Sequence, residues 1–368
     1  MDATAAVVKV KEEPFEVGRV SIGEPRADEV LVKVVACGVC HTDLICRDQW
    51  YPVPLPSVFG HEGSGIVEAV GEGVRKVVPG DRVAMSYNSC GLCGNCLSGN
   101  PGYCKQFFDS NFSGARPDGS NAYAGEGGEE VHVHFFGQSS FATHALARER
   151  NVVKVREDVP LELADPLGCG IQTGAGGVLN SLRPEAGSSI AVFGTGTVGM
   201  SAVMAARVAG CATIIGVDIK PNRLELAMEL GATHVINGAE EDAVARIKEI
   251  TAGGANYSIE TTASPAVFRQ SVDCLTQLGT CGLIGAAAVG TEAKVDISTM
   301  LLFGNRIKGI IEGDAIPDVF IPRLLELYVQ GRFPFDRLVK FYELEEINRA
   351  AEDSEKGDVV KAILRMPA

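Results

Sequence analysis

Hydrophobic and polar residues follow one pattern in roughly the first 150 residues and another after about residue 165. In the first part, short runs rich in Val, Ile and Ala are separated by Gly and Pro-Gly-Asp turns, which is typical of β-strands in a small barrel. The first strand is expected within residues 1–13, and further strands within 30–40 and 63–85. The Gly/Ser/Asn-rich stretch 109–131 is predicted to be mostly loop.

After about residue 165, apolar runs of strand length alternate with segments of helical spacing. The run SSIAVFGTG (188–196) predicts a buried strand, and VGMSAVMAARVAG (198–210) predicts a helix that ends at a glycine. The alternation continues through expected strands at 212–218, 234–237, 257–262 and 280–285 and expected helices at 223–231, 243–253 and 266–279. This order predicts a doubly wound parallel sheet of the α/β class. Later in the chain, helices are expected at 320–333 and 345–357 and a last strand at 359–366.

Composition narrows the class of protein. The chain has 368 residues, 46% of them hydrophobic, and a formal net charge of −14, so neither nucleic acid nor an anionic membrane is expected as a partner. No apolar run is long enough to span a membrane, and residues 1–13 have no signal-peptide pattern. We therefore expect a cytoplasmic enzyme. In that reducing compartment, eleven cysteines are expected to be metal ligands or buried side chains.

A dinucleotide-binding fingerprint stands between the first two elements of the α/β pattern. The motif GTGTVG (194–199) follows an apolar strand and opens a helix, and Asp218 ends the next expected strand. Glycines at 194, 196 and 199 permit a tight turn and close approach of a pyrophosphate to the helix N-terminus. Asp218 can accept hydrogen bonds from ribose hydroxyls and would repel a 2′-phosphate, which favours NAD over NADP. The alternative is a glycine turn that only packs helix on strand.

Four cysteines form a closed set of candidate metal ligands. Cys90, Cys93, Cys96 and Cys104 are spaced C-x2-C-x2-C-x7-C, and four thiolates with no open position are typical of a structural zinc site. An iron–sulfur cluster is the alternative metal, but bacterial ferredoxin runs have a last gap of three residues followed by proline. Here the gap is seven residues and Lys105 follows. Four unligated buried cysteines are the remaining alternative.

A second candidate ligand set is of a different chemical kind. Cys40 follows a strand, His61 lies in a glycine-flanked turn, and Cys169 precedes the nucleotide-binding pattern. Two thiolates and one imidazole leave zinc one open position, which is the pattern of a catalytic site. Each of these residues taken singly is equally compatible with an ordinary buried position.

Several motifs together resemble the zinc-dependent medium-chain alcohol dehydrogenases over essentially the whole chain. They are GVCHTD (38–43), GHEGSGIVEAVGEGV (60–74), PGDRV (79–83), the four-cysteine run, FGTGTVG (193–199) and KGIIEG (308–313). Three longer stretches are similar to the aryl-alcohol (benzyl alcohol) dehydrogenase branch: residues 40–63, 135–146 and 166–176. The resemblance implies a GroES-like β-rich catalytic domain at 1–165 plus 311–368, with a structural-zinc lobe at 86–107, and a Rossmann NAD-binding domain at 166–310.

The resemblance also implies roles for individual residues. Cys40, His61 and Cys169 would hold a catalytic zinc, with Glu62 behind the metal as a transient ligand. Thr42 would hydrogen-bond the substrate alcohol, and Asp43 would orient His61. Residues that would contact NAD are His41, Thr173, Gly194, Gly196, Val198, Gly199, Asp218, Arg223, Ile284, Ala286 and Lys361. Candidates for the substrate pocket are Trp50, Tyr51, Ser86, Phe112, Phe135 and Phe136.

The implied activity is reversible, NAD- and zinc-dependent oxidation of a primary aromatic alcohol to the aldehyde, with two zinc ions per subunit. A geraniol or perillyl alcohol dehydrogenase, a glutathione-linked formaldehyde dehydrogenase, a noncatalytic NAD-binding relative and a zinc or redox sensor are the alternatives. A homodimer or homotetramer is expected, joined through edge strands of the nucleotide-binding domains.

One position departs from the family pattern. Family members often carry a histidine five residues after the first zinc-ligating cysteine, as the terminal base of a proton relay, and Ile45 stands there in this chain. An isoleucine cannot accept a proton. We hypothesise that the cofactor ribose hydroxyl delivers the proton directly to water; the alternative is that another group replaces the base.

Overall fold

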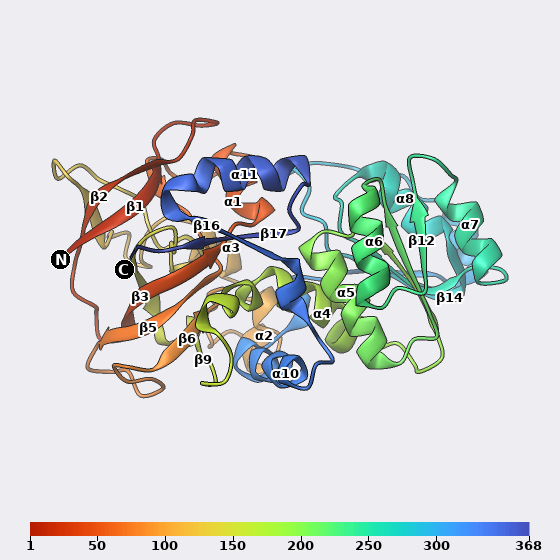
Figure 1. Ribbon diagram of the computed structural model, residues 1–368, viewed down its shortest axis with the longest axis horizontal. Coiled ribbons are helices and arrows are strands. Elements are labelled where there is room, and N and C mark those ends of the chain that lie inside the picture. The colour runs from red at the N-terminus through yellow and green to blue at the C-terminus, as the bar shows by residue number, and fades with distance from the viewer. Residues whose placement is uncertain (368) are drawn as a thin grey trace. The chain divides into compact units, whose positions relative to one another are not determined.

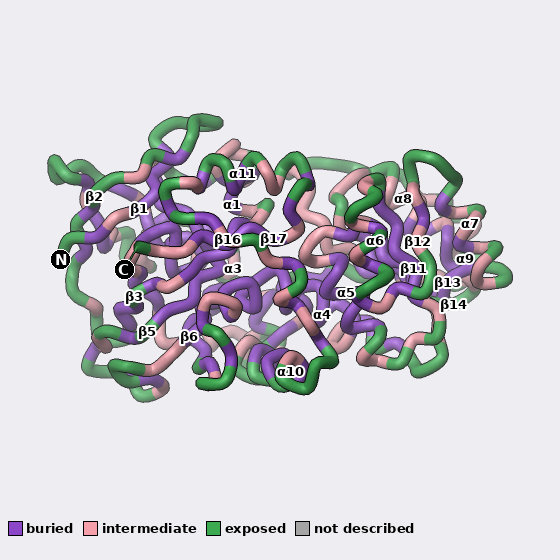
Figure 2. Tube along the Cα trace, viewed as in Figure 1, coloured by how far each residue is buried: buried purple, intermediate pink, exposed green. Residues whose placement is uncertain are grey.

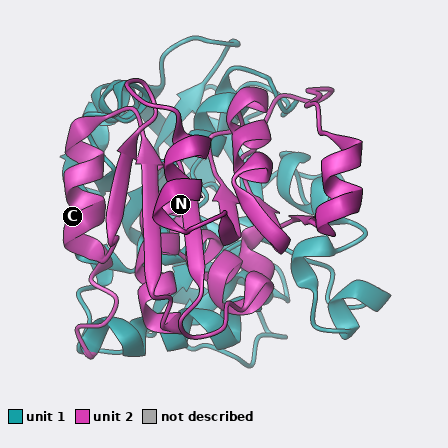
Figure 3. Ribbon diagram, turned by 90° about the vertical axis from the view of Figure 1, so that its right-hand side faces the viewer, with its two compact units in different colours: residues 1–169, 316–329, 336–368 teal, residues 170–315, 330–335 magenta. Residues whose placement is uncertain are grey.

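The computed structural model describes residues 1–367, which divide into two compact units (Figure 3). Unit 1 contains residues 1–169, 316–329 and those from 336 onward, and unit 2 contains residues 170–315 and 330–335. These limits differ slightly from the predicted domains. Cys169 belongs with the first unit, and residues 311–315 belong with the second, because Gly313 packs directly against the backbone of Gln172 and Gly176.

Unit 1 is built on two sheets. One has the strand order β16-β17-β3-β5-β6-β9, with β8 also paired to β3, and the other has the order β4-β1-β2-β7. The strands are β1 (Asp2–Val8), β2 (Glu16–Ile22), β3 (Glu29–Gly38), β4 (Ser57–Val58), β5 (Gly63–Val70), β6 (Arg82–Met85), β7 (Tyr123–Gly125), β8 (His144–Arg148), β9 (Val152–Lys154), β16 (Val339–Glu343) and β17 (Lys361–Arg365). Central strand β3 is buried along nearly all of its length, and Figure 2 shows the buried interior of this unit.

The helices of unit 1 are short, except for two near the C-terminus. They are α1 (His41–Arg47), α2 (Gly94–Leu97), α3 (Phe107–Phe112), α10 (Pro317–Val329) and α11 (Ile347–Lys356). The expectation that 109–131 is mostly loop is confirmed, and the exceptions are the end of α3 and strand β7, which pairs with β2. No helix of residues 1–367 is both long and apolar enough to cross a membrane.

Unit 2 is a sheet flanked by helices (Figure 1). Its strands are parallel and have the order β12-β11-β10-β13-β14-β15. Its strands are β10 (Ser189–Phe193), β11 (Thr213–Asp218), β12 (His234–Asn237), β13 (Ala255–Glu260), β14 (Leu275–Leu283) and β15 (Arg306–Gly309). Its helices are α4 (Gly170–Gly176), α5 (Thr197–Ala209), α6 (Pro221–Leu230), α7 (Ala243–Ile250), α8 (Pro265–Asp273) and α9 (Ile297–Phe303). The doubly wound α/β architecture predicted from the alternation is confirmed.

One predicted helix of unit 2 is too long. The segment 266–279 was expected to be helical throughout, but α8 ends at Asp273 and β14 begins at Leu275. Leu275 pairs with Ala255 of β13 and is 1% exposed, so sheet pairing and burial override helical spacing there.

Candidate metal and nucleotide sites

The side chains of Cys40, His61, Glu62 and Cys169 converge in unit 1, with their ligand atoms within 4.8 Å of one another. Three different elements bring them together. Cys40 is the N-cap residue of α1, His61 lies between β4 and β5, and Cys169 follows the short helix η5 (Asp165–Gly168). The predicted mixed thiolate–imidazole set therefore exists as a spatial cluster, although 129 residues separate its ends in sequence.

Asp43 holds the imidazole of His61 in a defined orientation. Its Oδ1 lies 2.8 Å from His61 Nδ1, and both side chains are fully buried. The same carboxylate accepts the backbone N–H of Gly60 at 3.0 Å and that of Cys40 at 3.0 Å. Because Nδ1 donates to Asp43, Nε2 is the ring nitrogen of His61 that is left for a ligand. This is the orientation that a metal-ligating histidine requires.

The electrostatics of this set indicate a site for a cation. A hydrogen bond from Cys169 lowers the pKa of the Cys40 thiol well below its usual value, and the charge of His61 lowers it further. Burial opposes protonation of His61, but Asp43 and the Cys40 thiolate raise its pKa well above the usual value. Zinc prefers thiolate and neutral imidazole ligands, so its binding would displace the proton that the raised pKa leaves on His61. The residues present thus fit a zinc ion held by Cys40, His61 and Cys169, with the Glu62 carboxylate beside them.

The side chain of Lys361 has a buried ion-pair partner that was not predicted. It was expected to contact the NAD pyrophosphate, but its side chain is only 2% exposed and forms an ion pair with the fully buried Glu62. Its Nζ also donates to the backbone carbonyl of Val39 at 3.1 Å. The ammonium therefore balances the carboxylate beside the ligand set, and its contact with the NAD pyrophosphate remains a prediction.

The four cysteines of the predicted lobe also converge. Cys90, Cys93, Cys96 and Cys104 have their Sγ atoms within 4.8 Å of one another. Backbone N–H groups of the lobe point at the sulfurs: Leu92 and Cys93 donate to Cys90 Sγ at 3.4 and 3.3 Å. Backbone hydrogen bonds from Lys105 and Cys96 lower the pKa of Cys93 to about 6, whereas desolvation raises the pKa of Cys96 to about 12. Four sulfurs held this way fit a closed tetrahedral site.

Aromatic rings cover one side of His61. The ring of Phe136 lies 4.5 Å from the imidazole, centroid to centroid, and that of Phe135 lies 5.6 Å away. Phe112 contacts both phenylalanines, at 5.8 and 5.2 Å, and Tyr51 contacts Phe112 at 5.9 Å. Four of the predicted pocket residues are therefore gathered beside the ligand set. We call Tyr51, Phe112, Phe135 and Phe136 the aromatic wall.

Two predicted pocket residues have other surroundings. The Ser86 hydroxyl is fully buried and donates to the carbonyl of Gly168 at 2.7 Å, so it braces the turn that leads to Cys169. Trp50 is 48% exposed, and its ring contacts His41 edge-on at 6.2 Å, outside the aromatic wall. Neither residue is part of the aromatic wall, and their contacts with substrate remain predictions.

In unit 2 the motif at 194–199 forms a turn between β10 and α5. Gly194 has a φ of +83°, and a Cβ there would lie 2.5 Å from Thr261 Oγ1. A Cβ on Gly199 would lie 1.8 Å from the carbonyl oxygen of Gly194, whereas nothing lies within 4 Å of a Cβ on Gly196. Gly194 and Gly199 are thus needed for the turn itself, and Gly196 leaves open space at the N-terminus of a 13-residue helix. This cradle fits the pyrophosphate of a dinucleotide.

Asp218 also supports this turn. Its Oδ2 accepts the backbone N–H and the hydroxyl of Thr195 at 2.7 and 2.9 Å. Its Oδ1 accepts the backbone N–H groups of Ile219 and Lys220 at 2.8 and 3.0 Å. Binding of ribose hydroxyls, as predicted, would therefore exchange or share bonds that currently hold the glycine turn. This structural role was not predicted from the sequence.

The other residues predicted to contact NAD differ in burial and in their hydrogen-bond partners. Val198, Arg223, Ile284 and Ala286 are half-buried in unit 2, and Arg223 Nε has no hydrogen-bond partner within the described part of the chain. Thr173 is 7% exposed, and its hydroxyl lies 3.4 Å from a carboxylate oxygen of Glu312. His41 is exposed at the start of α1 in unit 1. Their roles toward NAD, and that of Thr42, remain predictions.

Gln138 is a residue that sequence analysis missed. Its side-chain carbonyl accepts the N–H of Gly63 at 3.0 Å, and its amide donates to the carbonyl of His61 at 2.9 Å. It thereby holds the backbone on both sides of Glu62. Its location in the FFGQSSF stretch, directly after two pocket candidates, was the only sequence signal for such a role.

Two family models match the chain. One, described as an alcohol dehydrogenase GroES-like domain, matches residues 26–157, and the other, described as a zinc-binding dehydrogenase, matches residues 197–330. A geraniol dehydrogenase from Castellaniella defragrans is 49% identical over 366 residues, which cover 99% of this chain and 98% of that protein.

Two solved structures match the whole chain. The benzyl alcohol dehydrogenase of Acinetobacter calcoaceticus has a TM-score of 0.97 at 54% sequence identity, with all of both chains covered. An alcohol dehydrogenase zinc-binding domain protein from Burkholderia ambifaria has a TM-score of 0.99 at 57% identity, again with all of both chains covered.

Proposed function

Because this chain belongs to the zinc-dependent medium-chain alcohol dehydrogenases, we propose that it oxidises a primary aromatic alcohol of the benzyl type to the aldehyde, with NAD as hydride acceptor. The observation that carries the proposal is the aromatic wall beside the Cys40–His61–Cys169 set, with Phe136 4.5 Å from the His61 ring. Flat aromatic side chains complement a planar arylmethanol and exclude water from its reacting carbon.

The two ligand sets would hold different metal ions. Cys90, Cys93, Cys96 and Cys104 would saturate a structural zinc, so that site would take no part in the reaction. A zinc ion held by Cys40, His61 and Cys169 would supply a Lewis acid that lowers the pKa of a bound alcohol hydroxyl. We therefore expect two zinc ions per chain.

The chain's own side chains would prepare the alcohol for hydride loss. Asp43 keeps the proton of His61 on Nδ1, so that Nε2 stays available as a ligand. Thr42, half-buried in the first turn of α1, would accept a hydrogen bond from the substrate hydroxyl. Phe135 and Phe136 would orient the aromatic ring of the substrate.

A panel of alcohols tests the substrate class. We would compare kcat/KM for benzyl, cinnamyl, geranyl and ethyl alcohols, each with NAD and with NADP. We expect benzyl alcohol with NAD to have the highest value, because Asp218 at the end of β11 disfavours a 2′-phosphate. A higher value for ethanol would refute the aromatic assignment, and equal rates with NADP would refute the cofactor assignment.

The second candidate is an allylic terpene alcohol. The 49% identity to a geraniol dehydrogenase supports it, and an allylic C=C bond beside the hydroxyl offers the wall a planar group as benzyl alcohol does. In the same panel, a higher kcat/KM for geraniol than for benzyl alcohol would assign the chain to this second function.

We also propose that the chain forms homo-oligomers through unit 2. Edge strand β15 is exposed along all four of its residues, and Ile297, Leu301 and Leu302 of α9 are 78–81% exposed. An unpaired edge strand beside apolar side chains suits pairing with a second copy. Light scattering should give a dimer or tetramer that Leu301→Glu dissociates; a monomeric wild type would refute the proposal.

A further inference from the structure

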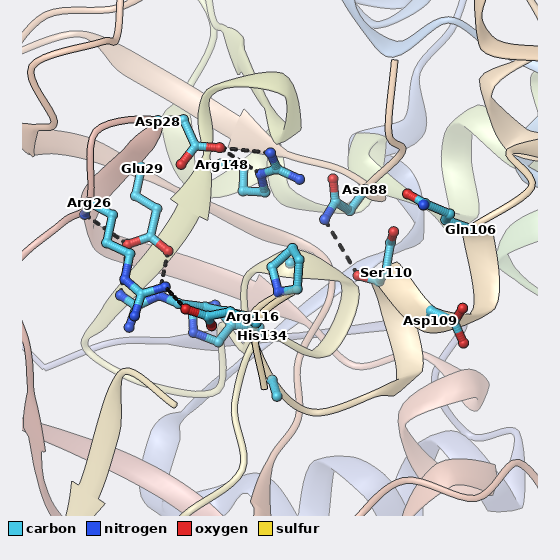
Figure 4. A pocket seen from close by; sticks show the side chains of 14 residues that line it. Arg26, Asp28, Glu29, Asn88, Gln106, Asp109, Ser110, Arg116, His134 and Arg148 are labelled. Atoms are coloured by element: carbon cyan, nitrogen blue, oxygen red, sulfur yellow. Dashed lines mark hydrogen bonds and ion pairs between the residues drawn. The ribbon is translucent and has the colours of Figure 1, made fainter. Parts of the chain in front are cut away.

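Unit 1 contains a polar cavity of about 430 Å³ that plays no part in the proposed reaction (Figure 4). Its lining comes from the segment that leads into β3, from the polar face of α3, from residues 115–118, and from the loop after His134. The volume is within the range of small-molecule sites in proteins. Neither metal-ligand set contributes a side chain to it.

Two buried hydrogen-bond acceptors in this lining have no partner. His134 is 7% exposed and Asn88 is 4% exposed, and within residues 1–367 neither His134 Nε2 nor Asn88 Oδ1 receives a hydrogen bond. Burial and the charge of Arg116 lower the pKa of His134 to about 4, so the ring is neutral near pH 7. A backbone hydrogen bond at Leu146 engages the ring, which leaves Nε2 as an acceptor. Unpartnered buried acceptors are rare, and both of these atoms are shielded from the cavity in this structure, so a donor in the cavity reaches them only when the two side chains turn.

The charged groups of the lining largely neutralise one another. Each of its three arginines bonds to a carboxylate of the same lining. The pairs are Arg26–Asp118, Arg116–Glu29 and Arg148–Asp28, with closest N···O distances of 2.7, 2.6 and 2.7 Å. Asp109 adds a negative charge that disfavours an anion, while the arginines near the His134 ring disfavour a cation there.

We infer that this cavity is a binding site for a small neutral polyhydroxy compound of about hexose size. Once the His134 ring and the Asn88 amide turn toward the cavity, ligand hydroxyl groups can donate to His134 Nε2 and Asn88 Oδ1, and they also accept from the remaining N–H groups of the lining arginines. A neutral ligand avoids the desolvation of an unpaired charge among pairs that are already formed. The lining shares no residue with either metal-ligand set.

A ligand bound at His134 would also affect the aromatic wall, because one loop connects the two. His134, Phe136 and Ser139 all have positive φ values, of 68°, 51° and 54°, so this loop is held in left-handed conformations that non-glycine residues rarely adopt. The same loop lines the cavity through His134 and carries Phe135 and Phe136 of the aromatic wall. A ligand on His134 would therefore stabilise the loop that positions the wall.

Three hexose probes of one frame and different charge test the inference on the full-length, metal-loaded protein. Saturation-transfer NMR titrations would compare glucose, glucuronate and glucosamine. We expect saturable binding of glucose and at least tenfold weaker binding of both charged probes. Tighter binding of glucuronate or glucosamine would overturn the assigned ligand class, and no saturable binding of any probe would show that the cavity holds only water.

Variants locate the binding. His134→Asn tolerates the left-handed backbone but shortens the acceptor, and should weaken glucose binding at least tenfold. Ser110→Phe fills the cavity from α3 and should abolish binding. Ser113→Phe is the matched control, because Ser113 is exposed just beyond α3 and outside the lining. Unchanged binding in Ser110→Phe would overturn the inference even if His134→Asn failed to fold.

Discussion

The two cysteine-containing ligand sets of unit 1 differ in how far along the chain their supports lie. In the four-cysteine lobe, ligands and supporting groups all lie within residues 90–106; the N–H of Gln106, for example, donates to Cys104 Sγ at 3.4 Å. In the other set, Cys40 and Cys169 are 129 residues apart, and Gln138 holds the backbone of His61 from a third segment. The lobe is a local structure, whereas the mixed set is a product of the tertiary fold.

The side chains of the two ligand sets also differ in how deeply they are buried. Three of the lobe cysteines are only half-buried, while His61, Glu62 and Asp43 are fully buried. Low exposure strengthens the interaction of Asp43 with His61 and of Lys361 with Glu62. A metal at the lobe would therefore stabilise a surface segment. A metal at the mixed set would lie among oriented charges that can change its reactivity.

The largest effect is expected from Cys169→Ser. Removing one ligand of the mixed set should lower the zinc content from two ions per chain to one and lower kcat at least about 10³-fold, because a Lewis acid contributes several kcal/mol. Mass spectrometric metal analysis and steady-state kinetics measure both quantities. Cys211→Ser, a half-buried thiol outside both sets, is the control and should keep both ions. Full activity with a single ion would contradict the assignment of the two sites.

Cys96→Ser should lower stability while changing activity little. Loss of the lobe metal is expected to lower Tm by about 5 °C or more and to expose residues 86–107 to proteolysis, because the local ligand bonds stabilise this segment. At low temperature, kcat should stay within about tenfold of the wild-type value. The comparison fails if kcat falls as far as in Cys169→Ser while Tm is unchanged.

Asp43→Asn should have an intermediate effect confined to the mixed set. The amide can donate to His61 Nδ1 and thus favour the wrong tautomer, so zinc affinity and kcat/KM should fall about 10- to 100-fold. Competition with a chelator measures the affinity. Asp48→Asn at the end of the same helix, where the carboxylate pairs with Arg47, should change neither. Equal losses of affinity at both metal sites would indicate a general folding defect.

The smallest effect is expected from Ile45→His. Ile45 is 2% exposed in α1, and a histidine there would be neutral above its ordinary pKa of about 6.5 and able to accept a proton. If the chain lacks a terminal base, the variant should oxidise alcohol faster than the wild type between about pH 6.5 and 8, once each rate is divided by the same protein's rate at pH 10. We expect this gain to be less than about tenfold. An unchanged pH–rate profile in a variant with wild-type Tm would refute the base-deficient relay.

The sequence predicted the α/β order and the ligand sets more completely than the surroundings of the site. The cysteine spacing and the GTGTVG turn were readable because each depends on a few neighbouring residues. The end of α8 at Asp273 was not, because pairing of β14 with β13 decides it. The hydrogen bond of Ser86 to Gly168, the contact of Trp50 with His41 and the ion pair of Lys361 with Glu62 could not be predicted either, because they depend on side-chain direction and burial.

By itself, therefore, the sequence determined which ligands and which turn this protein contains, since those depend on residue type and short spacing. Only the tertiary structure decided that Gln138 holds the backbone of His61, that Lys361 neutralises Glu62, and that the aromatic wall faces the imidazole. These contacts join residues far apart in the chain. Their energies depend on burial and direction, which appear only once the strands and loops have packed.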